Sequence, residues 1–241
     1  MTNPSGGAPM AAPADKASVF EDFIDIFHSP AAVFARREKS GPGLTLLFVT
    51  VVCASFVFAN RGVMSQIFDA EFQRGMAKAM AANPQISADQ MNSMRGIQEK
   101  IFGIVQYIIP PLVVLFTAFF LWLAGLVLKT KVSFEQAALI VTLAFIPRLL
   151  GFLATTLQVL LMDTSRITSA AGISLSPARF MDPDTSNPKL FAALLNLDLF
   201  TLWYVVVIGI GISVIAKVPR SKGYVTSGVV FVVLSLPSLL R

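Results

Sequence analysis

The chain has 241 residues, of which 55% are hydrophobic and only 14% carry a charge, and its formal net charge is +5. A soluble domain is roughly 45–50% apolar and 25% charged, so these proportions and a mean hydropathy of +0.71 exclude an ordinary soluble protein. The basic residues lie in short segments between apolar runs instead of forming a basic face on a soluble domain, which excludes a nucleic-acid-binding protein. The composition predicts an integral membrane protein whose main partner is the lipid bilayer.

The first 40 residues precede the first apolar run. Residues 1–17 are rich in Pro, Gly and Ala, which predicts a disordered N-terminus, and they lack the charged start and apolar centre of a cleavable signal peptide. In residues 18–40, Ser29 and Pro30 are typical of the N-cap and first position of a helix. Four apolar residues before them recur at helical spacing, namely Phe20, Phe23, Ile24 and Phe27. The segment therefore predicts two short amphipathic helices on the cytoplasmic side of the membrane.

The polar face of the first amphipathic helix is acidic and consists of Glu21, Asp22 and Asp25. Interfacial helices usually have a basic polar face instead. One interpretation is that these acids face the basic turns that come later in the chain. The other is an ordinary amphipathic helix whose acidic face is solvated, and the sequence leaves both open.

Five apolar runs approach or exceed the roughly 20 residues that a helix needs to cross the hydrocarbon layer. They cover residues 44–59, 101–128, 137–162, 190–216 and 224–240. The expected fold class is therefore an all-α, polytopic membrane helical bundle with five transmembrane helices, formed by residues 41–241. Within this domain, residues 60–100 predict a helical hairpin outside the membrane, because Asn83–Pro84 ends one helix and Ser87 with Gln90 matches the capping box of the next.

Lys and Arg residues beside the runs predict the orientation of the chain. Two short turns are basic, and they contain Lys129 and Lys131, then Lys217, Arg220 and Lys222. Because short basic segments stay in the cytoplasm, the N-terminus is expected to be cytoplasmic and the C-terminus outside. An Ala-rich composition with few Lys residues favours a bacterial inner membrane.

Arg148 and Asp198 lie within the third and fourth apolar runs. Ionisable groups at membrane depth are costly, so they normally face the protein interior or water and have a partner. We predict an ion pair between Arg148 and Asp198, helped by Asn196 or Gln158 in the same intramembrane polar cluster. The pair could be a structural clasp or part of a path for an ion or substrate, and both interpretations stay open.

Prolines and glycines predict how the helices bend and pack. Pro110 and Pro111 in the second run and Pro147 in the third lack the amide hydrogen that a helix uses, so helix kinks are expected at these positions. Gly209 and Gly211 in the fourth run offer a close helix–helix contact surface.

Signals of catalysis are nearly absent. The chain has one histidine, His28, and one cysteine, Cys53, and it contains no HExxH, GxSxG or P-loop pattern. A single cysteine excludes a disulfide or a thiolate metal cage within one chain. We expect a protein that is not an enzyme and that has no cofactor and no metal site.

Two stretches carry a resemblance to a known family. The segment "FEDFIDIFHSPAAVFARRE" precedes five spans, and "SFEQAALIVTLAFIPRLLG" begins the third span. Together they resemble the Yip-domain family of Ypt/Rab-interacting multi-pass membrane proteins, in its bacterial branch, and Phe134, Gln136 and Pro147 match the family's pattern. The resemblance implies an all-helical five-span fold, chain ends on opposite sides of the membrane, and no known enzymatic activity. The eukaryotic branch has an Asp-Leu-Tyr-Gly-Pro-like stretch where this chain has "IFHSP", so Rab binding is not inferred.

Two functional hypotheses follow, and the sequence favours the first over the second, which is the alternative. The first is a non-enzymatic membrane organiser or adaptor that meets protein partners through residues 18–40 or the hairpin 60–100, or meets anionic lipid through its basic turns. The second is a transporter, channel or lipid-handling protein with a polar path lined by Arg148, Asp198, Gln158 and Gln106. A continuous wet cavity that reaches Arg148 would favour the second hypothesis, and a solidly packed bundle with Arg148 satisfied by other protein groups would favour the first. The sequence does not indicate a ligand, a specific partner or an oligomeric state.

Overall fold

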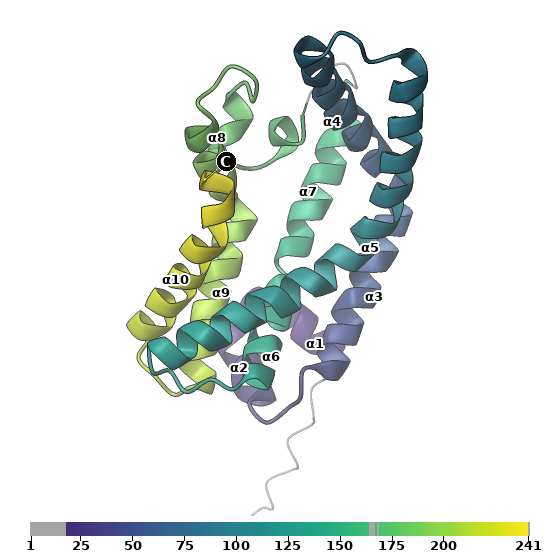
Figure 1. Cartoon of the computed structure of the whole chain (residues 1–241). Helices are drawn as coiled ribbons and strands as arrows, with labels where there is room; N and C mark the ends of the chain where they lie inside the picture. The colour runs from purple at the N-terminus through teal and green to yellow at the C-terminus, as the bar shows by residue number, and fades with distance from the viewer. Residues whose placement is uncertain (1–17, 164–166, 168, 241) are drawn as a thin grey trace, which may run out of the picture.

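The computed structural model describes residues 18–163, 167 and 169–240, and every regular element in this part of the chain is a helix (Figure 1). The N-terminal segment 1–17, for which the sequence predicts disorder, lies outside the described residues. The α-helices are α1 Val19–Asp25, α2 Pro30–Arg37, α3 Gly43–Ala59, α4 Arg61–Ala82, α5 Ala88–Val127, α6 Phe134–Phe145, α7 Arg148–Leu161, α8 Pro188–Asn196, α9 Leu199–Ile215 and α10 Arg220–Leu239. Two short 3₁₀ helices, η2 Ala171–Ile173 and η3 Pro177–Phe180, lie in the segment before α8.

Three stretches of the described chain are long and apolar enough to cross a membrane as they stand: α5, α6 together with α7, and α10. Two bent pairs raise the total to as many as five spans, namely α3 with α4, bent by 74°, and α8 with α9, bent by 56°. The predicted all-α polytopic bundle is therefore confirmed. The predicted run 190–216 is not one straight helix, because α8 ends at Asn196 and α9 begins at Leu199.

Local sequence explains where several helices begin. Ser87 accepts a hydrogen bond from the amide of Gln90, and the Gln90 side chain accepts one from the amide of Ser87, so the predicted capping box is present. Ser133 and Gln136 make the same reciprocal pair at the start of α6. These caps satisfy amides that otherwise have no partner in the first turn of a helix.

The prolines act in two different ways. Pro110 and Pro111 lie inside the continuous helix α5, which is bent along its length but not broken (Figure 1). Pro147, in contrast, separates α6 from α7. The amides of Leu149 and Leu150 bond to the carbonyls of Ile146 and Pro147, three residues back, so the break is a single tightened turn.

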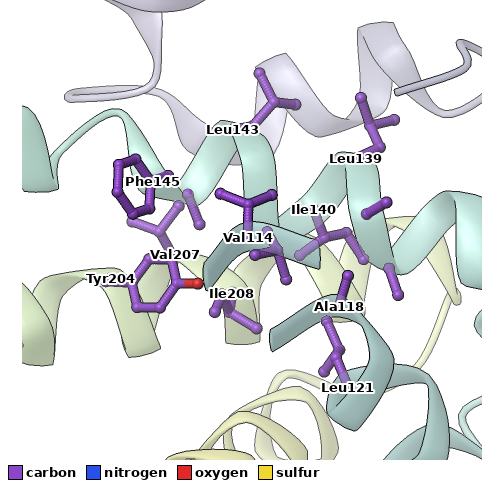
Figure 2. Packing of buried hydrophobic residues seen from close by; sticks show 14 of the residues in the cluster. Val114, Ala118, Leu121, Leu139, Ile140, Leu143, Phe145, Tyr204, Val207 and Ile208 are labelled. Carbon is purple, nitrogen blue, oxygen red and sulfur yellow. The ribbon is translucent and has the colours of Figure 1, made fainter. Parts of the chain in front are cut away.

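Helix α6 forms the centre of the bundle. Every residue from Ala137 to Phe145 is buried, and the surrounding core is contributed by α2, α3, α5 and α9. Figure 2 shows residues of α6 such as Ile140 packed between Val114 and Ala118 of α5 and Ile208 of α9. Because neighbouring helices cover α6 on all sides, its continuous apolar sequence fits a core helix and not one that faces lipid.

The helices α1 and α2, here called the arm (residues 18–38), are packed into the lower end of the bundle (Figure 1). Ile26, Val33 and Phe34 are each fully buried in the main core. The ring of Phe27 meets that of Trp203 edge to face, with 5.9 Å between the ring centroids. The arm is thus a tertiary part of the bundle and does not lie free on a membrane surface.

Asp22 and Asp25 pair with arginines of the arm, which corrects the interpretation that they face the basic turns. Asp22, only 1% exposed, accepts hydrogen bonds from Arg36 at 2.7 Å and from Arg37 at 2.5 Å. Asp25 bonds Arg36 at 2.7 Å, and this bond raises the pKa of the Arg36 guanidinium above its usual value. Burial of the arm's apolar residues brings α2 against α1, so the arginines of α2 reach these carboxylates. Glu38 does meet a basic turn, because Lys217 Nζ lies 2.8 Å from its Oε1.

Small residues allow α9 to approach both α10 and α2, as expected from Gly209 and Gly211. A Cβ atom added at Gly223 of α10 would collide with the carbonyl oxygen of Gly209 and with Ser213 Oγ. A Cβ atom added at Gly211 would lie 2.8 Å from the ring of Phe34, so Phe34 fits only against a glycine. These glycines set the spacing of the helices that hold the arm and surround the cavity described below.

We expect Gly223→Ala to lower the free energy of unfolding by about 1–3 kcal/mol, because the new methyl group meets a backbone atom that cannot move aside. Gly228→Ala on the same helix is the matched control, since a Cβ atom there has nothing within 4 Å. It should raise stability by up to about 1 kcal/mol through helix propensity. Unfolding in mixed micelles followed by circular dichroism gives both values. Equal effects of the two substitutions would contradict this close packing.

We expect Asp22→Asn to destabilise the arm by about 2–4 kcal/mol, because the change leaves Arg36 and Arg37 facing a neutral amide at a buried position. Trypsin cleavage at these arginines, measured on the folded protein, should become faster. Glu21→Gln is the control, since Glu21 is an exposed capping residue and should lose less than about 1 kcal/mol. Unchanged cleavage in Asp22→Asn would show that the charge pair does not hold the arm.

Candidate functional site

A cavity of about 480 Å³ lies between α5, α9 and α10 and reaches the first residue of α7. Its polar lining includes Thr117, Arg148, Asp198, Tyr204 and Ser227. Its apolar lining includes Val113, Phe116, Phe231 and Leu234. The cavity therefore presents a polar region and an apolar region to the same space. We call it the Arg148 cavity.

A second cavity of about 280 Å³ lies beside α4, α7 and the segment around η2. It shares Arg148, Ser174 and Asp198 with the Arg148 cavity, so these residues form the wall between the two. The segment that closes this region is tied to α4, because Asp184 accepts hydrogen bonds from Lys78 and Arg74. The hydrogen bond from Lys78 lowers the pKa of the exposed Asp184 carboxyl.

Arg148 is held by aromatic rings. Its guanidinium carbon lies 5.3 Å from the ring centroid of Tyr204 and 5.6 Å from that of Phe145, within the range of cation–π attraction. The two rings meet edge to face, so the site has a fixed geometry. Within the described residues, Arg148 takes part in no ion pair and no hydrogen bond. The predicted ion pair between Arg148 and Asp198 is therefore wrong, although both side chains line both cavities.

Asp198 is occupied by backbone amides. It is the N-cap of α9, and its Oδ1 accepts hydrogen bonds from the amides of Phe200 at 3.0 Å and Thr201 at 3.4 Å. Its Oδ2 accepts the amide of Leu175 at 3.0 Å. A carboxylate at a helix N-terminus is stabilised by these amides and by the helix dipole. The bend between α8 and α9 thus uses Asp198 to satisfy the backbone, which is why it does not reach out to Arg148.

The other two members of the predicted polar cluster have partners of their own. Asn196 donates to Ser238 Oγ at 2.9 Å and lines the Arg148 cavity. Gln158 donates to the carbonyl of Ile173 at 2.9 Å and lines neither of the two cavities. The structure therefore brings Arg148, Asp198 and Asn196 to one cavity and places Gln158 outside it.

Tyr204 is the functional candidate that sequence reasoning missed. Its side chain is 5% exposed, and its hydroxyl, next to Thr117, makes no hydrogen bond of normal geometry in the described structure. Figure 2 shows that hydroxyl directed toward α5, in the region of Val114. The sequence signal that could have identified Tyr204 is its position inside the apolar stretch "LFTLWYVVVIG". A buried tyrosine hydroxyl needs a hydrogen-bond partner, and the side chains of this stretch offer few.

A model of the Yip1 domain matches residues 24–240, which is nearly the whole chain. The chain belongs to the Yip1-domain family. With its apolar helices, this membership makes it a multi-pass membrane protein. No curated protein and no solved structure matches the chain. The bacterial branch and the orientation of the chain ends stay predictions.

The two basic turns of this Yip-family chain lie side by side, at the same end of the bundle as the arm. Lys222 Nζ donates to the carbonyl oxygen of Lys129 at 3.1 Å. Both turns follow a helix that ends in a Schellman motif, with Thr130 N bonded to Gly125 O and Val218 N bonded to Ser213 O. Lys129, Lys131 and Lys217 have φ values of 54°, 57° and 54°, a conformation that usually selects glycine. Lysine therefore stands where the backbone alone favours glycine. Arg220 begins α10 and completes the basic surface.

A third cavity of the Yip-family chain is almost wholly apolar. It has a volume of about 370 Å³ and lies between α3, α5 and α7, with Cys53, Pro110 and Gln106 in its lining. The Gln106 side chain does not reach the Arg148 cavity, so it does not belong to one polar path with Arg148. Among the described residues, no group of three or more His, Cys, Asp or Glu side chains could hold a metal ion.

We expect Lys129→Gly to raise the free energy of unfolding by about 1 kcal/mol, because glycine adopts a positive φ without the steric cost of a Cβ atom. Lys129→Ala is the matched control, since it removes the same charge but keeps the Cβ atom, and it should not stabilise the protein. Chemical unfolding of both variants in the same micelles provides the comparison. A gain in Lys129→Ala as large as that in Lys129→Gly would mean that charge repulsion, not backbone conformation, disfavours the lysine.

Proposed function

We propose that this Yip-family protein is a non-enzymatic lipid-handling protein that binds an amphiphilic ligand in the Arg148 cavity. The observation that carries the proposal is that Arg148 lines this cavity and that its side chain, among the described residues, has neither an ion pair nor a hydrogen bond. This arrangement supports a ligand-handling protein. The proposal takes up the second of the two hypotheses drawn from the sequence.

The Arg148 side chain is partly buried among apolar helices. A charged group removed from water is costly unless other groups pair with it. The rings of Phe145 and Tyr204 compensate Arg148 in part, but an aromatic face supplies only about 0.5–2 kcal/mol. A ligand with an oxygen atom at this position would supply the missing partner.

The size and lining of the cavity support an amphiphile. Ligand pockets in proteins commonly measure about 300–1,000 Å³ and combine an apolar lining with a few polar groups, and a cavity of about 480 Å³ falls in this range. The lining combines the apolar side chains of Phe116 and Phe231 with the charged side chains of Arg148 and Asp198. A ligand with a polar head and an apolar chain would meet both regions.

The same lining supports binding without catalysis. Its titratable side chains are Arg148, Asp198 and Tyr204, and both carboxylate oxygens of Asp198 already accept backbone amides. Cys53 faces a different cavity, and His28 belongs to the arm. The cavity thus lacks the hydrogen-bonded pair of nucleophile and base that covalent catalysis requires.

An organiser or adaptor role is a second candidate function, and the basic turns favour it. Lysines occupy positions 129, 131 and 217, where the positive φ of the backbone favours glycine. Basic residues near an anionic membrane surface gain about 1 kcal/mol each. We propose that this end faces the cytoplasm of a bacterial cell, that the C-terminus lies across the inner membrane, and that protein partners meet the arm or the hairpin of α4 and α5.

We expect Val113→Trp to abolish binding of co-purifying lipid, because the indole fills the apolar side of the Arg148 cavity. The control is Leu112→Trp, which adds the same side chain at a 54% exposed position that does not line the cavity. Native mass spectrometry of the full chain, purified from its membrane in a mild neutral detergent, counts the bound lipid.

In this experiment, the wild type and Leu112→Trp should retain lipid through purification, and Val113→Trp should lose at least nine-tenths of it. Circular dichroism confirms that both variants are folded. Equal lipid retention in Val113→Trp and Leu112→Trp would mean that lipid binds elsewhere on the protein, and the proposed function would then fail.

A further inference from the structure

We propose that the ligand of the Arg148 cavity is a phospholipid with one negative charge, whose phosphodiester is bound by the Arg148 guanidinium and the Tyr204 hydroxyl. The inference rests on the proposed function and deepens it by naming the chemical class of the ligand. It follows from four features of the cavity: the free donors of Arg148, the hydroxyl of Tyr204, the charge of Asp198, and the apolar side chains of α5 and α10.

Arg148 offers a set of free donors in a fixed plane. The rings of Phe145 and Tyr204 lie 5.6 Å and 5.3 Å from its guanidinium carbon, so aromatic contacts hold the group. The N–H donors lie in the guanidinium plane and, within the described chain, no carboxylate or carbonyl accepts them. A planar guanidinium with free N–H groups matches two oxygens of a phosphate, which it binds through two parallel hydrogen bonds.

Tyr204 supplies a second donor beside the first. Its side chain is 95% removed from solvent, its hydroxyl lies next to Thr117 but makes no hydrogen bond of normal geometry within the described residues, and it lines the same cavity as Arg148. A buried hydroxyl that makes no hydrogen bond is unfavourable, so the site is incomplete without an acceptor. An anionic oxygen bound by Arg148 would lie within this small polar region and could accept the hydroxyl as well.

The charge balance of the cavity favours one negative charge over two. Arg148 contributes one positive charge, and Asp198 contributes a negative charge at the wall shared with the second cavity. Three backbone amides donate hydrogen bonds to the two Asp198 carboxylate oxygens. A phosphodiester anion is neutralised by Arg148, whereas a phosphomonoester dianion would place a surplus negative charge near Asp198.

The apolar side of the cavity favours a lipid over a free phosphate ion. Val113 and Phe116 of α5 and Phe231 and Leu234 of α10 line it. Phe116 is 58% exposed, so the apolar surface continues from the cavity onto the outside of the bundle. The acyl chains of a lipid gain from contact with this surface, and an inorganic anion gains nothing from it.

The test uses the delipidated full chain in a neutral detergent, with native mass spectrometry as the readout. The three probes are dioleoylphosphatidylglycerol, dioleoylglycerol (the same chains without phosphate) and inorganic phosphate. The wild type should bind the phosphatidylglycerol at least tenfold more tightly than the dioleoylglycerol and should not bind inorganic phosphate at the same concentration. Binding of inorganic phosphate as tight as that of the lipid would overturn the assignment to a lipid.

Two variants test the residues named. Arg148→Gln should abolish the tenfold preference for the phosphatidylglycerol, and Tyr204→Phe should weaken its binding about three- to tenfold while leaving dioleoylglycerol binding unchanged. Tyr204→Phe removes only a hydroxyl without a partner, so it keeps the fold even if Arg148→Gln does not. Arg61→Gln is the matched control, because Arg61 also stacks on a phenylalanine ring, Phe58, but lines neither cavity, and its preference should equal that of the wild type.

The outcomes separate this inference from the proposed function. If Arg148→Gln and Tyr204→Phe keep the preference while Val113→Trp loses both lipids, a lipid binds in the cavity but its phosphate is not held by these residues, and the inference falls alone. If Val113→Trp binds both lipids like the wild type, the inference and the proposed function fall together. Loss of the preference in Arg148→Gln and a three- to tenfold smaller preference in Tyr204→Phe, with Arg61→Gln unaffected, support the inference.

Discussion

A guanidinium among apolar helices must find an oxygen, and the position of Arg148 shows how this bundle meets that constraint. Hydrocarbon supplies no hydrogen-bond partners, so each polar group within the membrane depends on the protein or on a ligand. Pro147 ends α6 and makes Arg148 the first residue of α7. Two rings then hold the guanidinium at the wall between two cavities. The ligand-binding account follows from this placement.

The carboxylate that could neutralise Arg148 has another role. Asp198 caps α9 and also accepts an amide from the segment before α8, so it ties the start of α9 to that segment. Backbone amides at a break in a membrane helix need hydrogen-bond acceptors as much as a polar side chain needs a partner. The bend therefore occupies the Asp198 carboxylate with backbone amides, and Arg148 does not pair with it.

Much of the fold could be predicted from sequence, because hydropathy and caps are local properties. The helical bundle, the capping box of Ser87 and Gln90, and the break at Pro147 all follow from short stretches. The helix break at Asp198 was not predicted. Hydropathy averaged over residues 190–216 indicates one continuous span, so Asp198 was interpreted as a charge inside that span and not as the N-cap of a new helix. Whether Arg148 meets Asp198 depends on the 56° bend between α8 and α9, which no local pattern contains. The missing partner of Tyr204 likewise depends on helices far apart in the sequence. The partners of Asp22 and Asp25 could not be predicted for the same reason. Burial of Val33 and Phe34 in the core brings α2 against α1, and this tertiary contact is not visible in the local sequence.

The most direct test of the account is to identify the oxygen that neutralises Arg148 in a bilayer. Solid-state NMR of the wild-type chain in phosphatidylglycerol bilayers can measure dipolar couplings from the guanidinium ¹⁵N atoms of Arg148 to the ³¹P of lipid and to the carboxyl ¹³C of Asp198, with Arg148→Lys used to assign the signal. The account predicts a strong coupling to ³¹P and none of comparable strength to Asp198. A strong coupling to the Asp198 carboxyl without any coupling to ³¹P would contradict it.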